Sequence, residues 1–426
     1  MANYRKRVVD EILALKLESS AAVLVEGAKW CGKTTTCRQV AKSVIYMDAP
    51  EFREQNIARA QISPSTILDG AQPRLIDEWQ IAPQLWDAIR HHADREGVIG
   101  GYMITGSAVP ADIDELKHSG TGRFSWLRMR PMSLWESGES SGAVSLQDLF
   151  DAVDLKNAAA HEHKLEGIAE LICRGGWPQS LQMTKRASLM VARNVVDAVI
   201  NRDISRVDKV ARDAERARRI MRSYARLQGT QATAKVIKAD LMAQEMTSLD
   251  DDTVYSYLNA LRKIFIVEDM PAWCPNLRTK DAIRSSDTRY FVDPSVAAAA
   301  LGVGPGELMN DLKTLGFLFE AMAVRDLRVY SEFLDGEVRH YHDRSGLECD
   351  AVIHLRNGSY ALIEIKLGGA HLIEEGVKSL TKLERLIAAK NGKSPAFRMI
   401  LTAVGQFAYC RPEDGIVVCP IGCLKM

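Results

Sequence analysis

The stretch Gly27-Ala-Lys-Trp-Cys-Gly-Lys-Thr34 decides the fold of the N-terminal part of the chain, because it matches the pattern GxxxxGK[ST] in full. The apolar run Ala22–Val25 precedes it and is typical of a buried strand, and Lys33–Ser43 follows as a predicted helix. A glycine-rich loop in this position directs its backbone amides and the helix N-terminus toward one point, where phosphate groups bind. The stretch therefore predicts an ATP-binding loop, and the alternative is an ordinary glycine-rich turn.

Each position of this loop has an expected part in binding ATP. The Lys33 ammonium would neutralise the β- and γ-phosphates, the Thr34 hydroxyl would ligate Mg²⁺, and Thr35 would reach the α-phosphate. The predicted ATP-contacting residues of the loop are Gly27, Ala28, Lys29, Trp30, Cys31, Gly32, Lys33, Thr34 and Thr35.

The stretch Leu75-Ile-Asp77-Glu78 supplies the acids that such a loop requires. Its apolar strand would carry Asp77 to the sheet edge beside the loop, where the carboxylate holds Mg²⁺. Glu78, next to it, is placed to polarise the attacking water as a general base. An acidic pair after an apolar run is by itself more typical of a helix N-terminus, and the complete loop upstream favours the catalytic interpretation.

Two positions further along the chain extend the predicted nucleotide site. Thr105-Gly-Ser107 ends another predicted strand, so that Ser107 is expected to sense the γ-phosphate. Arg123 lies beyond this strand and is expected to contact ATP as an arginine finger, with an ordinary surface charge as the alternative.

The pattern around these motifs alternates strands and helices. In addition to the strand and helix that flank the loop, this pattern predicts helices at Val8–Leu17 and Pro83–His92. It also predicts strands at Val44–Met47, Arg74–Ile76, Tyr102–Thr105 and Leu127–Met129. This order predicts an α/β fold with a parallel sheet and helices on both of its faces.

The whole chain has 426 residues, so we expect roughly two to four domains. The part that follows the predicted parallel sheet has different patterns of apolar residues. Ser145–Leu227 has helical spacing, and Thr230–Arg262 holds short helices followed by a strand at Ile264–Val267, which suits a winged-helix unit or an ordinary helix pair. A second, mixed α/β domain is then predicted from helices at Leu312–Val329 and Glu374–Ile387 and strands at Glu337–His342, Cys349–Leu355, Tyr360–Lys366 and Arg398–Thr402.

This last region contains a second set of acidic residues. Asp350 lies on one predicted strand, and Glu364 and Lys366 share one face of the next because side chains alternate along a strand. Glu320, on the preceding helix, is a possible third carboxylate. Asp350 and Glu364 could hold Mg²⁺ at a scissile phosphate, while Lys366 stabilises charge or activates water. The alternative is an exposed Glu-x-Lys pair without function.

The charge balance of the chain limits how it could bind DNA. Lys and Arg total 55, as do Asp and Glu, so the formal net charge is +0 and any DNA-binding surface must be a local patch. Arg202–Arg226 is locally basic and suits either phosphate contacts or a solvated helix face with ion pairs.

The sequence also predicts a cytoplasmic location. No signal-peptide pattern or apolar run of ~20 residues is visible, so no membrane partner is expected. The eight cysteines are scattered without a CxxC pair, which favours reduced thiols.

The motifs together resemble one family. The Gly27–Thr35 loop, Leu75-Ile-Asp-Glu-Trp-Gln80, Thr105-Gly-Ser107 and Gly175-Gly-Trp-Pro178 look like those of prokaryotic AAA-type ATP-binding proteins with a C-terminal domain of unknown function, DUF4143. The resemblance implies an AAA+ core at 1–140, a helical region at 141–228, a winged-helix-like part at 229–300 and a restriction-endonuclease-like domain at 301–426. Glu320, Asp350, Glu364 and Lys366 are similar to the signature positions of that PD-(D/E)xK fold, although Cys349 replaces the proline.

Two functions follow as hypotheses. The first is a P-loop ATPase that hydrolyses ATP, is coupled to a DNA-directed, possibly nucleolytic C-terminal domain, and forms a homo-oligomer. The second is a regulatory ATPase switch whose C-terminal nuclease-like fold is inactive.

Overall fold

A computed structural model describes residues 4–108, 120–155, 158–243, 250–275, 286–389 and 392–426. The chain divides into two compact units. The first comprises Met1–Pro131, Ala198–Ala214 and Tyr257–Ile266, and the second comprises Met132–Asp197, Glu215–Ser256 and Val267–Met426. Each unit contains its own β-sheet and is described separately.

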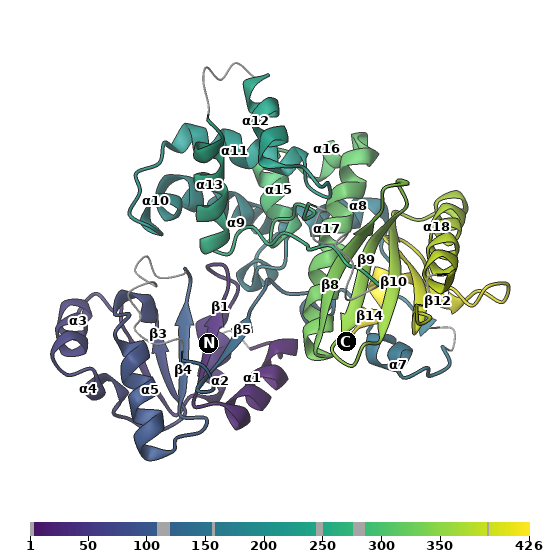
Figure 1. The fold of residues 1–426 in the computed structure, drawn as a ribbon. Coiled ribbons are helices and arrows are strands. Elements are labelled where there is room, and N and C mark those ends of the chain that lie inside the picture. The colour runs from purple at the N-terminus through teal and green to yellow at the C-terminus, as the bar shows by residue number, and fades with distance from the viewer. Residues whose placement is uncertain (1–3, 109–119, 156–157, 244–249, 276–285, 390–391) are drawn as a thin grey trace. The chain divides into compact units, whose positions relative to one another are not determined.

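The sheet of the first unit has the strand order β2-β3-β4-β1-β5, and all four pairings are parallel (Figure 1). Its strands are β1 (Ala22–Glu26), β2 (Ser43–Tyr46), β3 (Arg74–Asp77), β4 (Tyr102–Gly106) and β5 (Phe124–Arg128). Because β4 lies between β1 and β3, the chain segments that follow these three strands meet at one edge of the sheet. The predicted parallel sheet is confirmed.

Helices cover both faces of this sheet, as predicted. On one face, the side chains of α1 (Val8–Ser19) and α2 (Lys33–Val40) pack with Val23 and Val25 of β1. On the other, α3 (Arg53–Ile62), α4 (Ser65–Leu68) and α5 (Leu85–Glu96) pack with Leu24. Neighbouring strand residues face opposite sides, so a strand that is apolar throughout, such as β1, must be buried on both faces.

The second unit contains a seven-stranded sheet in the order β7-β12-β13-β11-β10-β9-β8. Its strands are β7 (Ala158–Ala159), β8 (Gly336–His342), β9 (Glu348–Leu355), β10 (Tyr360–Lys366), β11 (Phe397–Thr402), β12 (Phe407–Cys410) and β13 (Val417–Pro420). Helix α17 (Leu312–Phe333) packs against β8, β9 and β10, and α18 (Ala370–Ala389) packs against β9, β10 and β11 (Figure 1). The mixed α/β domain predicted for this region is therefore present.

The region at 141–228, which is predicted to be helical, also contains two short strands. β6 (Val144–Ser145) pairs with β14 (Leu424–Lys425), and β7 pairs with β12. Each of these strands is two residues long, so neither gives a recognisable alternating pattern. The sheet of the second unit consequently includes residues that precede the predicted C-terminal domain by about 140 positions in the sequence.

The remainder of the middle part is helical. Its main helices are α8 (Leu165–Arg174), α9 (Lys185–Ala198), α11 (Ala214–Arg226), α12 (Ala234–Met242), α13 (Asp251–Lys263) and α15 (Pro294–Leu301). Isolated antiparallel bridges join Val267 to Phe291 and Met270 to Thr288. The strand predicted at Ile264–Val267 is thus reduced to one bridge residue, because Lys263 and Ile264 still belong to the end of α13 and its following turn.

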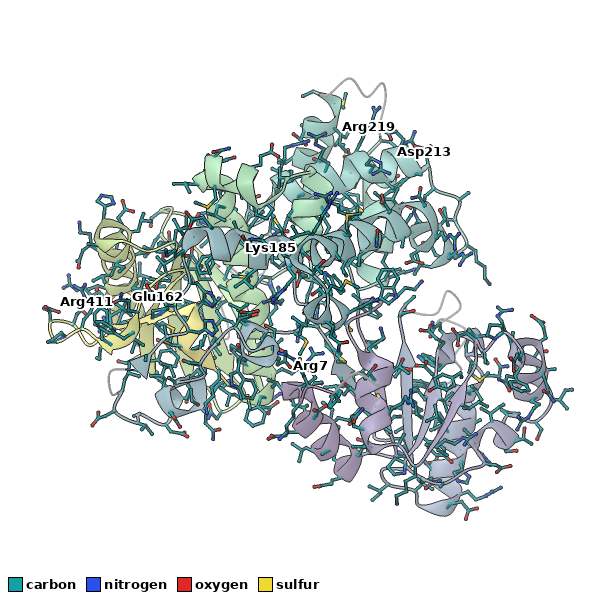
Figure 2. The ribbon with its side chains drawn as sticks, turned by 180° about the vertical axis from the view of Figure 1, so that it is seen from behind. Arg7, Glu162, Lys185, Asp213, Arg219 and Arg411 are labelled. Atoms are coloured by element: carbon teal, nitrogen blue, oxygen red, sulfur yellow. The ribbon has the colours of Figure 1, made fainter. Side chains whose placement is uncertain are left out.

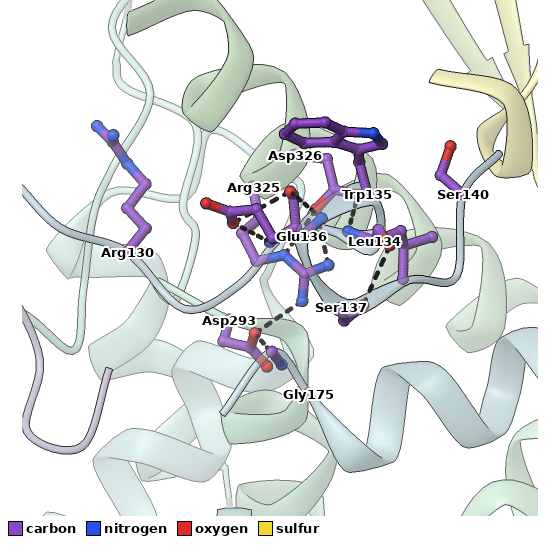
Figure 3. A network of polar contacts seen from close by, with 12 residues as sticks. Arg130, Leu134, Trp135, Glu136, Ser137, Ser140, Gly175, Asp293, Arg325 and Asp326 are labelled. Carbon is purple, nitrogen blue, oxygen red and sulfur yellow. Dashed lines mark hydrogen bonds and ion pairs between the residues drawn. The ribbon is translucent and has the colours of Figure 1, made fainter. Parts of the chain in front are cut away.

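The Gly175-Gly-Trp-Pro178 motif lies in a buried polar network (Figure 3). The Asp293 carboxylate accepts a hydrogen bond from Gly176 N at 3.0 Å and from Arg325 Nη1 at 2.9 Å. Trp177 Nε1 donates to Ser295 Oγ at 2.9 Å. A Cβ atom on Gly176 would lie 2.1 Å from the Met132 carbonyl oxygen, so the backbone needs glycine there. The motif therefore has a structural role in the second unit.

Candidate functional site

The phosphate-binding loop requires glycine at both ends for different reasons. A Cβ on Gly27 would lie 2.0 Å from the Met129 carbonyl oxygen, so this position is sterically closed to other residues. Gly32 caps α2 with φ of 107°, which lies in the region that favours glycine. Arg7, which is buried, donates to the Cys31 carbonyl at 3.0 Å and to the Arg130 carbonyl at 2.9 Å. The loop is thus fixed by its glycines and by an arginine that sequence reasoning did not select.

Lys33 is buried, and its ammonium lies within the loop itself. Its Nζ donates to the carbonyl oxygens of Gly27 at 2.8 Å and of Ala28 at 2.9 Å. These carbonyls satisfy a charge that is only 6% exposed. A phosphate oxygen entering the loop would exchange neutral carbonyl partners for an anionic one, which makes a stronger hydrogen bond.

Asp77 connects the loop to the middle of the sheet. Its Oδ1 accepts a hydrogen bond from Thr34 Oγ1 at 2.8 Å and another from Thr105 Oγ1. The hydroxyl and the carboxylate are the hard oxygen ligands that Mg²⁺ prefers. The two predicted magnesium ligands, Thr34 and Asp77, therefore lie side by side, and they fit a magnesium ion on donor chemistry.

Glu78 follows Asp77 in the left-handed backbone region, with φ of 57°. Its Oε2 accepts hydrogen bonds from Ser107 Oγ at 3.1 Å and from Gln80 Nε2. Burial raises the pKa of Glu78, which is the direction that suits a general base working near neutral pH. A non-glycine residue in this conformation stores strain and is often found at a functional site.

Gln80 is the contact that sequence reasoning missed, even though it lies within the motif Leu75-Ile-Asp-Glu-Trp-Gln80. The available signal was its position two residues after Glu78. Only the tight turn formed by η1 (Trp79–Ile81), which starts from the left-handed Glu78, brings the amide back to the carboxylate.

The other loop residues have diverse surroundings. Cys31 is buried and its Sγ contacts the Met129 carbonyl at 3.4 Å, while Trp30 is 51% exposed with φ of 65°. Thr35 is exposed in the first turn of α2. Lys29 forms an ion pair with Asp203. The role of each in contacting ATP stays a prediction.

Arg123 lies at the opposite edge of the sheet from the phosphate-binding loop of its own chain, and its predicted role as an arginine finger stays a prediction. Arg123 directly precedes β5, whose first residue pairs with Ala22 of β1, whereas the loop follows the last residue of β1. The five strand residues in between span about 16 Å. The Arg123 Nε atom instead donates to Asp94 Oδ1 at 2.6 Å.

Several basic residues of the stretch Arg202–Arg226 form ion pairs. On α11, Arg219 contacts Glu215 at 3.1 Å (Figure 2), and Arg218 lies 3.6 Å from Asp197. Arg226 pairs with Asp240 of α12. This pattern favours the solvated helix face over a dedicated phosphate-binding surface.

The second candidate site is the acidic cluster on β9 and β10. The antiparallel register pairs Ile363 with Ala351, which brings Asp350 and Glu364 to neighbouring positions. Lys366 Nζ lies 3.0 Å from Asp350 Oδ2 and 2.6 Å from Glu364 Oε2. Asp350 Oδ2 also accepts from Ile365 N at 2.7 Å, and Glu364 Oε1 accepts from Ser379 Oγ at 3.1 Å. The three predicted residues are therefore brought together.

Glu320 lies near this group and has a partner of its own. The Tyr290 hydroxyl donates a hydrogen bond to Glu320 Oε1. Burial, followed by the negative charge of Asp350, raises the pKa of both Glu320 and Glu364. Burial lowers the pKa of Lys366, but the Asp350 and Glu364 carboxylates outweigh it, so the pKa rises overall. Tyr290 gives no signal in the sequence, because it precedes Glu320 by thirty residues outside any motif.

The cation between these carboxylates is the Lys366 ammonium. Within the described parts of the chain, no group of three or more His, Cys, Asp or Glu side chains is arranged to hold a metal ion. The magnesium site predicted at Asp350 and Glu364 would therefore require Lys366 to move. It stays a prediction.

Comparison with known families divides the chain into three parts. Residues 19–137 match a family described as an AAA domain, and residues 315–424 match a domain of unknown function, DUF4143. Residues 165–307 match another domain of unknown function, DUF8612. The first match contains the phosphate-binding loop, Asp77, Glu78 and Ser107, and the second contains the acidic cluster on β9 and β10.

Two relatives and two solved structures extend these matches. An uncharacterized protein of Mycobacterium bovis and one of Mycobacterium tuberculosis are each 23% identical over 369 residues, which is 85% of this chain and 74% of theirs. A Walker-type ATPase of Pyrococcus abyssi is 14% identical, with a TM-score of 0.41 over 68% of this chain and 94% of its own. The ORC1 protein of Aeropyrum pernix, solved in complex with DNA, is 13% identical, with a TM-score of 0.24 over 68% of this chain and 90% of its own.

Two further predictions concern the membrane and the thiols. Among the helices that the structure describes, none combines the length and the apolar character needed to cross a bilayer. All eight cysteines are free thiols, and six of them are buried.

Proposed function

Since the chain is an AAA-type ATP-binding protein with a C-terminal DUF4143 domain, we propose that its N-terminal unit binds ATP with Mg²⁺ and hydrolyses it. One observation carries this proposal. Thr34, Asp77, Glu78 and Ser107 lie at the ends of β3 and β4 and at the start of α2. Hydrogen bonds join Thr34 to Asp77 and Ser107 to Glu78 beside the buried Lys33.

Each of these residues has a proposed role that follows from its chemistry. Lys33 and the amides after Gly32 would hold the phosphates, and Thr34 and Asp77 would hold Mg²⁺, which neutralises phosphate charge when bound. Glu78 would accept the proton of the attacking water, with Ser107 and Gln80 fixing the orientation of its carboxylate. Burial of Glu78 favours its protonated form, so its ionisation should set the acidic limit of activity.

A pair of variants tests this assignment. In Lys33→Ala the buried cation is lost, so ATP affinity measured by titration calorimetry should fall to near the detection limit. Glu78→Gln should bind ATP with unchanged affinity and lose hydrolysis. Lys235→Ala, which changes an exposed lysine on α12, should behave as wild type in both assays. If Lys33→Ala binds ATP as well as wild type, the assignment of the loop is wrong.

We propose a DNA-directed, possibly nucleolytic function for the C-terminal part, on the strength of the acidic cluster. Asp350, Glu364 and Lys366 come from two adjacent strands and share contacts, and Glu320 reaches them from α17. The mostly buried carboxylate pair is costly, which favours a functional reason for keeping it. The two helices α12 and α13 with the bridged segment after them support a winged-helix arrangement as the DNA-binding element.

The competing proposal is a regulatory switch with an inert C-terminal fold. The observation that favours it is the position of Lys366, which already neutralises both carboxylates. Incubating the full chain with ATP, Mg²⁺ or Mn²⁺, and single-stranded, duplex or branched DNA separates the two functions. Cleavage that disappears in Asp350→Asn supports the nuclease, and absence of cleavage on every substrate supports the switch.

We propose that Arg123 acts between subunits, as an arginine finger toward the ATP of a neighbouring copy. Its guanidinium is 47% exposed at the side chain and paired with an Asp94 that is 34% exposed, so the pair is accessible to solvent. If the protein forms a homo-oligomer, mixing Arg123→Ala with Lys33→Ala subunits should restore some ATPase activity at mixed interfaces. A monomer by light scattering with a bound ATP analogue would remove the basis for this proposal.

A further inference from the structure

Lys29, the third residue of the phosphate-binding loop, has a partner that lies far away in the sequence. Its Nζ atom lies 2.5 Å from Asp203 Oδ1. The Asp203 side chain is only 11% exposed, while that of Lys29 is 47% exposed. Asp203 falls outside the AAA domain match at 19–137 and inside the DUF8612 match at 165–307. The loop is therefore contacted by a residue from another region of the chain within the same compact unit.

The backbone around Asp203 is unusual. Helix α9 continues into a π-helical turn, η4 (Val199–Asp203), and then into α10 (Ile204–Arg206). Ile204 N donates to Val199 O, the hydrogen bond of a π-turn. A π-turn adds one residue to the helical turn and redirects the side chains that follow, and such turns are frequent at functional sites. Val199, Ile200 and Ile204 are buried, so the helix is held by apolar packing at this point.

A second contact ties the same part of the structure to the sheet. The guanidinium of Arg128, the last residue of β5, lies 4.3 Å from the centroid of the Phe265 ring. Lys29 follows the end of β1, and β1 and β5 are parallel neighbours. Segments 198–214 and 257–266 thus both contact the sheet edge that carries the phosphate-binding loop.

We propose that Asp203 is a positioning residue of the nucleotide site, which holds the loop through Lys29 and links occupancy by a nucleoside triphosphate to the order of the helix around it. The inference rests on the ATP binding proposed above. Lys29 lies between Gly27 and Gly32, the two glycines of the loop, so an ion pair there restrains the backbone at the point where phosphate must bind. Coupling of this kind is reciprocal. If order in the helix strengthens nucleotide binding, bound nucleotide stabilises the ordered helix by the same free energy.

The expected size of the effect is modest. Because Lys29 is half-exposed, the ion pair is partly screened by water, and its loss should weaken nucleotide affinity by roughly two- to five-fold. This is far less than the loss expected for Lys33→Ala, whose ammonium would contact phosphate directly. The small size makes a comparison of single and double variants necessary.

The first test is a double-mutant cycle on the full chain, with titration calorimetry of a non-hydrolysable ATP analogue. Lys29→Ala and Asp203→Asn should each weaken binding two- to five-fold, and the double variant should be no weaker than either. The matched control is Lys185→Ala with Glu170→Gln, an exposed ion pair that includes the first residue of α9, which should leave affinity unchanged. Additive losses in the double variant would overturn the proposal.

The second test measures how well the helical segment 199–206 is ordered. Hydrogen exchange of the amides in 199–206 should slow when the analogue binds to wild type, and this protection should be lost in Lys29→Ala although α2 remains protected. A merely structural ion pair would leave the nucleotide-dependent difference intact. Protection of 199–206 that persists in Lys29→Ala contradicts the proposal.

The two levels of inference fail in different ways. If neither wild type nor Lys33→Ala binds the analogue, the proposed ATP binding itself is wrong. If wild type binds and only Lys33→Ala does not, while the cycle at Lys29 and Asp203 is additive, ATP binding stands and the positioning role alone is rejected.

Discussion

Thr34 Oγ1 lies 2.8 Å from Asp77 Oδ1, a hydrogen bond that joins the first turn of α2 to the end of β3 across 43 residues of sequence. The contact places a hydroxyl and a carboxylate together at the point where the phosphate-binding loop meets the centre of the sheet. It gives the magnesium prediction a geometric basis, because both oxygens are of the kind that Mg²⁺ prefers and they lie within hydrogen-bond distance of each other.

Thr34→Ala should remove the magnesium-dependent part of ATP affinity. With Mg²⁺ present, the variant should bind ATP more weakly than wild type, because one of the two ligands is lost. In EDTA the two proteins should bind equally, since Lys33 and the loop amides remain. Calorimetric titrations in the two buffers supply their own control. An equal loss of affinity in both buffers would show that Thr34 supports the loop and does not hold the metal.

Glu78→Gln should separate ATP binding from turnover. The amide keeps the shape and the contacts with Ser107 and Gln80 but cannot accept a proton, so hydrolysis should fall by about 10²–10⁴-fold. Phosphate release measures turnover, and calorimetry measures binding. Glu96→Gln, at the exposed end of α5, is the matched control. Wild-type turnover in Glu78→Gln would mean that another group activates the water.

Divalent metal should raise the thermal stability of the full chain through Asp350 and Glu364, by mass action. An Asp77→Asn background removes the carboxylate ligand of the other predicted metal site, which Asp77 forms with Thr34. In it, Asp350→Asn should abolish the Mn²⁺-dependent rise in Tm. Lys366→Ala should keep or increase the rise, because the competing ammonium is gone, while any cleavage stops.

The control for the metal experiment is Asp335→Asn, a substitution at an exposed carboxylate. If all variants respond to Mn²⁺ equally, or none does, Asp350 and Glu364 do not form a metal site. A fragment beginning near residue 309 is unsuitable for this experiment, because it lacks the β6 and β7 partners of β14 and β12.

Gly176→Ala should destabilise the second unit by about 1–3 kcal/mol or more, because its Cβ would overlap the Met132 carbonyl oxygen. The matched control is Gly167→Ala in α8, where an added Cβ meets nothing within 4 Å. That substitution should be neutral or slightly stabilising, since alanine favours a helix. Urea denaturation provides both values, and equal stability of the two variants would contradict the close approach of Gly176 to the Met132 carbonyl.

The buried His340 should make the folded protein sensitive to acid. Burial lowers its pKa to about 4, below the ordinary value near 6.5 that an unfolded chain would show. Between these values the unfolded state binds more protons, so the contribution of His340 is fully present above about pH 6.5 and is lost as the pH falls toward 4.

The measurement for His340 is the unfolding free energy at pH 7 and pH 5. His340→Gln should lower the stability difference between the two pH values, whatever its effect on stability at pH 7. The control is His371→Gln, which changes an exposed histidine on α18. If the pH dependence of His340→Gln equals that of wild type, His340 does not carry the acid sensitivity.

The positions of the residues in the proposed nucleotide site were predictable to a large extent, because the motifs that carry them are short and continuous in the sequence. The loop Gly27–Thr34 and the pair Asp77 and Glu78 are contiguous motifs, each directly after an apolar strand. Parallel strands bring such motifs to one edge whatever the rest of the fold. The same holds for Glu364 and Lys366, whose shared face follows from the alternation along β10.

The sequence by itself therefore determined the parallel sheet, the loop and the acids at its edge, since all of these depend on order and spacing within short segments. Tertiary structure alone decided the contacts between residues far apart: Lys29 with Asp203, Tyr290 with Glu320, and the strands β6 and β7 with the end of the chain. It also decided that Arg123 lies at the opposite edge of the sheet from the phosphate-binding loop, because β5 runs parallel to β1 and Arg123 precedes it. Spacing along a chain fixes which side chains share a face, but only the packing of distant segments fixes which of them meet.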